Sequence, residues 1–217
     1  MLEAFRRLCP HERTVYLADT ENCPYGNRSE DEVRELSSAM AEKLIARGCK
    51  LIVIACNTAS AAALEHLRRR FPSVPFVGME PAIKPAAENT KSGIIAVLAT
   101  RGTFDGRLYR NTLARCAAGI KVIESLADEF VELVERGETS GEKAEAAVRK
   151  RILPLIEAGA DQIVLGCTHF PHLKPLMEKV AGGSAAIVDP SEAVSQQIRR
   201  VLSGLNLDNG CAPDDIT

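Results

Sequence analysis

Residues 44–56 read Leu-Ile-Ala-Arg-Gly-Cys-Lys-Leu-Ile-Val-Ile-Ala-Cys, and residues 155–167 read Leu-Ile-Glu-Ala-Gly-Ala-Asp-Gln-Ile-Val-Leu-Gly-Cys. The two stretches are identical at six of thirteen positions, at a constant spacing of 111 residues. Each has the pattern of a helix end, a glycine that stops the helix, a buried apolar strand and a cysteine. The chain therefore contains an internal repeat, and the thiols that close its two copies, Cys56 and Cys167, predict a site made of two similar halves.

Strand and helix patterns alternate along the rest of the chain. Helices are expected at 2–8, from a capping box at Ser29 to a stop at Gly48, and at 59–70, 104–116, 129–136, 141–158, after Pro171 and at 191–202. Strands are expected at 14–18, 51–55, 76–78, 94–99, 121–124, 162–165 and 185–188. This alternation predicts an α/β fold with parallel sheets covered by helices on both faces.

The repeat also predicts how the elements are grouped. We expect two similar doubly wound parallel-sheet lobes related by pseudo-two-fold symmetry, with the active site in the cleft between them. The first lobe would comprise residues 1–78 plus 190–217 and the second residues 79–189, with residues 208–217 as a loose tail. Ligands of such sheets bind at the carboxyl ends of the strands, where Cys56 and Cys167 both lie.

Composition excludes several classes of protein. An apolar content of 46% is ample for a core, and a net charge of −2 without a basic, aromatic-rich run argues against nucleic acid and anionic membranes as partners. The apolar run at 51–56 is far shorter than the roughly 20 residues of a membrane span, and no secretory leader is visible, so a cytoplasmic location is expected. The seven cysteines show no CxxC spacing, which predicts neither a disulfide framework nor a metal site, and all but Cys56 and Cys167 are interpreted as ordinary small residues.

The two thiols suit proton transfer. A cysteine at a strand end, before a helix N-terminus, meets the positive end of the helix dipole, which predicts a lowered pKa. The residues that follow, Asn57-Thr58 and Thr168-His169, offer donors that can hold a carboxylate. Two such thiols on opposite faces of a small molecule would move a proton from one side of a carbon to the other.

Residues 55–60 (Ala-Cys-Asn-Thr-Ala-Ser), 166–171 (Gly-Cys-Thr-His-Phe-Pro) and 24–26 (Pro-Tyr-Gly) strongly resemble the bacterial glutamate racemases of the aspartate/glutamate racemase superfamily. Residues 79–85 and 98–103 extend the resemblance over nearly the whole chain. The resemblance implies an enzyme without a cofactor that interconverts L- and D-glutamate and provides D-glutamate for peptidoglycan. A small-molecule substrate is then the partner, and a homodimer is compatible with the family.

The resemblance also implies residue roles. Cys56 would remove the α-proton of the D-isomer while Cys167 donates a proton to the opposite face, with the roles exchanged for the L-isomer. His169 would assist Cys167 as an acid or base. The implied substrate-binding residues are Tyr25, Gly26, Asn57, Thr58, Thr168 and His169. The weaker candidates, as auxiliary carboxylates, are Asp19, Glu80 and Glu135.

The sequence departs from the family pattern in two places. The family opens with a strand that ends in Asp-Ser-Gly, which this chain lacks, so the first strand of the first lobe is expected to be absent and turnover impaired. Before Glu135, Ala127-Asp128 stands where the family often has Cys-Pro. A catalytically silent binding or regulatory homologue therefore stays open. A racemase of aspartate or a hydantoin is a further alternative, although relatives acting on aspartate tend to carry glutamate where this chain has His169.

Overall fold

The structure is a computed structural model that describes residues 1–209. Its helices are α1 (Leu2–Leu8), α2 (Glu30–Ile45), α3 (Asn57–Arg70), α4 (Ile83–Asn89), α5 (Arg101–Asp105), α6 (Arg107–Cys116), α7 (Asp128–Glu135), α8 (Gly141–Glu157), α9 (Lys174–Ala181) and α10 (Ser191–Gly204), with a 3₁₀ turn η1 (Phe170–Leu173). Its strands are β1 (Ile52–Ile54), β2 (Phe76–Gly78), β3 (Ile94–Ala99), β4 (Lys121–Leu126), β5 (Gln162–Gly166) and β6 (Ala186–Val188).

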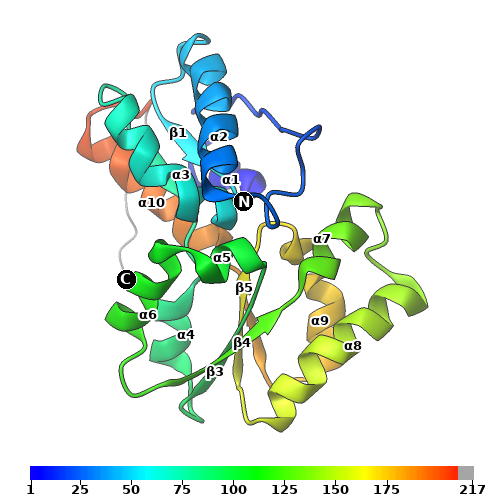
Figure 1. Cartoon of the computed structure of the whole chain (residues 1–217). Coiled ribbons are helices and arrows are strands. Elements are labelled where there is room, and N and C mark those ends of the chain that lie inside the picture. The colour runs from blue at the N-terminus through cyan, green and yellow to red at the C-terminus, as the bar shows by residue number, and fades with distance from the viewer. Residues whose placement is uncertain (210–217) are drawn as a thin grey trace.

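The strands form two parallel sheets, which confirms the predicted α/β class. One sheet pairs β1 with β2, and the other has the order β4-β3-β5-β6. Figure 1 shows α1, α2, α3 and α10 around the first sheet, while α7, α8 and α9 lie on one side of the second sheet and α4 and α6 on the other. The boundaries proposed for the two lobes stay a prediction, and residues 210–217 of the first lobe and of the expected tail lie outside the described residues.

Both copies of the repeat fold in the same way. After α2, the Gly48 N–H donates to the Ile45 carbonyl (2.8 Å), and after α8 the Gly159 N–H donates to the Ile156 carbonyl (2.9 Å). Both glycines have positive φ, +75° and +90°, which glycine adopts without the penalty of a Cβ. The same turn therefore leads each copy into its strand, and the two cysteines come out at equivalent strand ends.

The two repeat strands differ in burial. In β5, which lies between β3 and β6, Ile163, Val164 and Leu165 are fully buried. In β1 only Ile52 is buried, whereas Val53 and Ile54 are half-buried, and all three line the cleft described below. The expectation of a fully buried strand at 51–55 was therefore wrong.

Three other expectations need correction. Residues 14–18 form no strand: Val15 and Tyr16 are 51% and 72% exposed, and an apolar alternation makes a strand only where a sheet edge pairs with it. Helix α4, which has Pro85 in its first turn, was not expected. The helix expected at 104–116 is split into α5 and α6 at Gly106, where a Cβ would lie 2.5 Å from the Cβ of Ala61 in α3.

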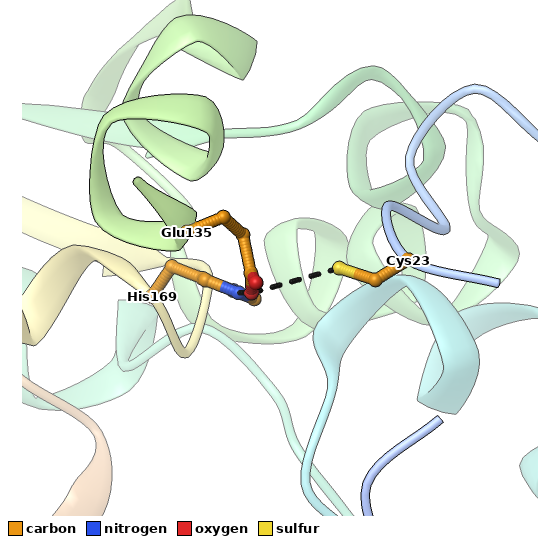
Figure 2. A group of neighbouring side chains, drawn as sticks. All are labelled: Cys23, Glu135 and His169. Carbon is orange, nitrogen blue, oxygen red and sulfur yellow. Dashed lines mark hydrogen bonds and ion pairs between the residues drawn. The ribbon is translucent and has the colours of Figure 1, made fainter. Parts of the chain in front are cut away.

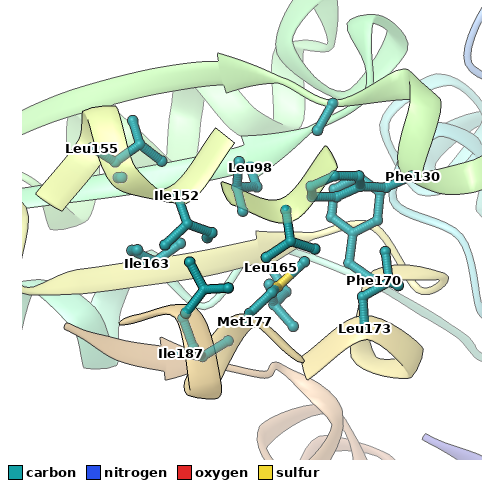
Figure 3. Packing of buried hydrophobic residues seen from close by; sticks show 14 of the residues in the cluster. Leu98, Phe130, Ile152, Leu155, Ile163, Leu165, Phe170, Leu173, Met177 and Ile187 are labelled. Carbon is teal, nitrogen blue, oxygen red and sulfur yellow. The ribbon is translucent and has the colours of Figure 1, made fainter. Parts of the chain in front are cut away.

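The largest hydrophobic cluster fixes the elements that carry the second half of the site. It fills the space between the β3–β6 sheet and α7, α8 and α9 (Figure 3). Phe130 of α7 meets Phe170 of η1 edge to face, with ring centroids 5.3 Å apart. This contact holds the first turn of α7 against the 3₁₀ turn that follows β5. A separate cluster joins Phe5 of α1 and Ile198 of α10 to Val77 of β2, so the last helix packs against the first sheet.

Candidate active site

A cleft of about 1550 Å³ runs between the β1 strand end and the loop after β5. It also extends along β1 toward α1 and α10. Most of the residues singled out from the sequence line this cleft: Asp19, Tyr25, Gly26, Cys56, Thr58, Glu135, Cys167, Thr168 and His169. The two copies of the repeat therefore contribute to one cavity.

Cys56 caps helix α3. Its Sγ accepts a hydrogen bond from the Ala59 N–H at 3.4 Å, so Cys56 is the N-cap of this helix. Burial raises the pKa of the Cys56 thiol, and hydrogen bonds from the N–H groups of Ala59 and Thr58 and from the Thr58 hydroxyl oppose this rise. Burial outweighs them, which contradicts the expected low pKa.

Cys167 follows β5 and is 9% exposed. Burial raises the pKa of its thiol to about 12, although a hydrogen bond from the backbone N–H of His169 lowers it. The α-helix expected after Pro171 begins at Lys174, and the 3₁₀ turn η1 lies between Cys167 and this helix. The repeat therefore ends at the thiols, and the second cysteine lacks the α-helical N-terminus that the first one caps.

His169 connects Cys167 to Glu135. Its Nδ1 lies 3.8 Å from the Cys167 Sγ, and its Nε2 lies 2.5 Å from the Glu135 Oε1. The hydrogen bond with His169 lowers the pKa of Glu135, so this group is a carboxylate at neutral pH. A carboxylate accepts the Nε2 proton, which leaves Nδ1 as an acceptor facing the thiol.

Asp19 holds Tyr25 on the opposite side of the cleft. The Tyr25 hydroxyl donates to Asp19 Oδ2 at 2.6 Å, and the Asn22 side-chain amide donates to Oδ1 at 2.8 Å. Burial raises the pKa of Tyr25, and the nearby Asp19 adds to this rise, so the phenol keeps its proton. For Asp19, burial works in the same direction, but the hydrogen bonds from Tyr25 and Asn22 prevail and lower its pKa.

Hydroxyl groups join the two halves behind the thiols. Thr58 Oγ1 lies 3.0 Å from Thr100 Oγ1, which lies 3.3 Å from Thr103 Oγ1. Thr168 Oγ1 donates to the Ala55 carbonyl at 3.1 Å. Asn57 is buried, and its side-chain amide has no hydrogen-bond partner in the part of the chain that the structure describes. Unlike the other predicted substrate-binding residues, Asn57 does not line the cleft.

Glu80, one of the three candidate carboxylates, lies outside the cleft. Its Oε2 accepts from the Thr112 hydroxyl at 2.7 Å and pairs with Arg115 at 3.4 Å, both on α6. These contacts give Glu80 a structural role on the far side of β3.

Among the residues that line the cleft, sequence reasoning assigned no role to Cys23, Thr100 or Asp128. Thr100 directly follows β3, and Asp128 comes two residues after β4, so the rule that ligands gather at carboxyl strand ends would have found both. Cys23 Sγ lies 3.7 Å from Glu135 Oε1, and burial, then the Glu135 charge, raises its pKa to about 11. Its only sequence signal is its position just before Pro24-Tyr25-Gly26.

The fold is that of an α/β enzyme with two thiols on one cleft, and residues 1–198 match the Asp/Glu/Hydantoin racemase family. The chain belongs to this family. It is 50% identical over 202 residues to a glutamate racemase of Roseiflexus sp. strain RS-1 (93% of this chain, 74% of the relative) and 46% identical over 208 residues to one of Herpetosiphon aurantiacus (96% and 82%). Among solved structures, it is similar to Escherichia coli glutamate racemase in complex with L-glutamate and the activator UDP-MurNAc-Ala, with a TM-score of 0.85, 33% identity and coverage of 98% and 79%.

Within residues 1–209, no helix is both long and apolar enough to cross a membrane.

Proposed function

We propose that this chain is a glutamate racemase that interconverts L- and D-glutamate without a cofactor. The observation that carries the proposal is the placement of Cys56 and Cys167, at equivalent ends of repeated strands, on one cleft. Family membership and the activity named for relatives at 46–50% identity support glutamate as the substrate.

The reaction needs one base and one acid on opposite faces of the α-carbon. With D-glutamate, the Cys56 thiolate takes the α-proton, and the Cys167 thiol gives its proton to the other face of the carbanion. With L-glutamate, the two thiols exchange these roles. Each turnover leaves one thiol and one thiolate, with their positions exchanged, so no proton is gained or lost overall.

Burial keeps both thiols protonated in the free protein, and the substrate changes that balance. An α-ammonium brought into the cleft adds a positive charge beside the sulfur that becomes the thiolate, and an opposite charge within several ångströms favours ionisation. On the Cys167 side, His169 Nδ1 is placed to accept the thiol proton, and Glu135 stabilises the imidazolium that forms.

The α-carboxylate of the substrate needs donors that strengthen as charge develops on it. The first turn of α3 supplies backbone N–H groups, and the unpartnered amide of Asn57 lies in the same turn. We assign Asn57, Thr58 and Thr168 to binding the carboxylate and the amine of the substrate, with Tyr25 and Gly26 approaching from the loop before α2. The provision of D-glutamate for peptidoglycan, a cytoplasmic location and a homodimer are predictions that follow from the family.

The test is proton exchange in heavy water. Incubation with either enantiomer of glutamate is expected to remove the α-proton signal and to form the other enantiomer, and Cys56→Ala and Cys167→Ala should each abolish interconversion. Cys116→Ala, a half-buried thiol remote from the cleft, serves as the control. Exchange that persists unchanged in both cleft variants excludes the two-thiol mechanism, and folded protein without exchange supports a silent homologue.

A further inference from the structure

Three side chains with metal-binding atoms meet at the edge of the cleft. Cys23 Sγ, a Glu135 carboxylate oxygen and a His169 ring nitrogen all lie within 4.8 Å of one another. Figure 2 shows that they come from three separate segments: the loop before α2, the end of α7 and the loop after β5. Cys23 and His169 are half-buried and Glu135 is exposed, so an ion from solvent can reach the group. The proposed proton-transfer mechanism does not use Cys23.

We infer that Cys23, Glu135 and His169 bind a divalent transition-metal ion of the Zn²⁺ type. Thiolate sulfur, imidazole nitrogen and carboxylate oxygen are the three ligand types that zinc takes from proteins. Soft thiolate and imidazole donors select such ions over Mg²⁺ and Ca²⁺, which prefer oxygen ligands. Three protein ligands leave a fourth tetrahedral position for water.

The distances suit this coordination with one adjustment. Metal–ligand distances of about 2.0–2.3 Å place tetrahedral ligand atoms roughly 3.3–3.7 Å apart. The distance of 3.7 Å between Cys23 Sγ and Glu135 Oε1 already fits. The His169 Nε2 and Glu135 Oε1 atoms, 2.5 Å apart, share a proton, and they separate by about 1 Å when the ion takes its place. The exposed, flexible Glu135 side chain can make this movement.

Charge also favours a cation here. Glu135 is the last residue of α7, so its carboxylate lies at the negative end of the helix dipole. Besides burial, the negative charge of this carboxylate disfavours a thiolate at Cys23. A divalent ion between the two groups compensates both negative charges. On binding, the Cys23 thiol releases one proton to water, and the His169 proton moves from Nε2 to Nδ1.

Metal binding would inhibit the reaction, and this step alone rests on the proposed function. With the metal on Nε2, His169 carries its proton on Nδ1, 3.8 Å from the Cys167 sulfur, and no longer accepts the thiol proton. The ion also ties the loop of Cys23 to α7 and to the loop after β5 at the edge of the cleft.

Binding is tested with Co²⁺ alone, by following thiolate-to-cobalt charge-transfer absorption. We expect one ion per chain and competition by Zn²⁺, with the band lost in Cys23→Ser, which offers no thiolate, and the affinity reduced about tenfold or more in Glu135→Gln. The Cys116→Ser control and the Cys56→Ala/Cys167→Ala double variant should retain the band. Loss of the band in the double variant together with its retention in Cys23→Ser would assign the ion to the other thiols and overturn the proposal, as would equal affinity in all variants. Circular dichroism of each variant verifies folding.

Inhibition is tested separately by titrating Zn²⁺ into the racemase assay. Measured against its own rate without zinc, Cys23→Ser should require about tenfold or more Zn²⁺ for half-inhibition than wild type. Unchanged inhibition in Cys23→Ser contradicts the regulatory step. If the protein has no racemase activity, the cobalt measurement still decides whether the metal site exists.

Discussion

Thr168 donates a hydrogen bond from its hydroxyl to the carbonyl oxygen of Ala55, 3.1 Å away. The residue after one cleft cysteine is thus tied to the residue before the other, although the two are 113 positions apart. This bond sets the separation of the two strand ends that carry the thiols.

Removal of this bond should affect turnover more than stability. We expect Thr168→Val to lower kcat/KM about tenfold, since the thiols lose their mutual alignment, and to lower the free energy of unfolding by only about 1 kcal/mol, the usual net value of a hydrogen bond. Racemase kinetics and urea unfolding measure the two effects. Thr112→Val, which loses the bond to Glu80 outside the cleft, should keep its turnover. Equal kinetic losses in both variants would contradict the role of Thr168.

The raised pKa of Cys167 predicts how stability depends on pH. The folded protein binds this thiol proton more tightly, with a pKa of about 12, than the unfolded chain, with a pKa near 8.5. The burial of the neutral thiol therefore contributes fully below about pH 8.5, and this contribution is lost as pH rises toward the folded value. The free energy of unfolding of wild type, measured with urea, should fall above about pH 8.5 more steeply than that of Cys167→Ala. Parallel curves for the two proteins would show that the Cys167 pKa is not raised.

Glu135 is expected to act through His169. Glu135→Gln replaces the carboxylate that accepts the Nε2 proton, so His169 loses its fixed tautomer and the stabilisation of its charged form. We predict that kcat/KM falls about 10- to 100-fold in both reaction directions, because an imidazole without its carboxylate partner is held less well in the orientation that accepts the thiol proton. Glu132→Gln, an exposed neighbour on α7 paired with Arg136, is the control and should stay within about twofold of wild type. A loss of the same size in the control would point to α7 as a whole.

Gly106 is predicted to be intolerant of even a methyl group. Its φ of −70° suits any residue, so the constraint is contact alone: a Cβ would lie 2.5 Å from that of Ala61. Gly106→Ala should therefore destabilise the fold by about 1–3 kcal/mol through overpacking of α5 and α6 against α3. Gly204→Ala, at the end of α10 with open space around it, should be neutral or slightly stabilising. Thermal unfolding compares the stabilities of the two variants. Equal stabilities would show that α3 moves to make room for the added methyl group.

Local patterns predicted the elements that depend on local interactions. Ser29 and Glu32 form both hydrogen bonds of the capping box, and Gly48 and Gly159 make the turns that the repeat indicated. Residues 14–18 failed because a strand exists only with a partner, which a pattern of apolar residues cannot supply.

The site divides in the same way. The family motifs predicted that Cys56, Cys167 and His169 share one cleft. They did not predict the contact of Cys23 with Glu135, because these residues are 112 positions apart and belong to no common motif. The helix-dipole argument predicted thiols of low pKa, but it could not weigh the burial that both thiols acquire only in the folded chain.

The unequal surroundings of the two cysteines have a thermodynamic consequence. Cys56 caps α3, while Cys167 precedes a 3₁₀ turn and contacts an imidazole. Mirror-image substrates have the same free energy in water, so the equilibrium constant of a racemisation is one and kcat/KM must be equal in both directions. The asymmetry of the two thiols can therefore appear only as compensation: the enantiomer that the cleft binds more tightly must be turned over more slowly, by the same factor.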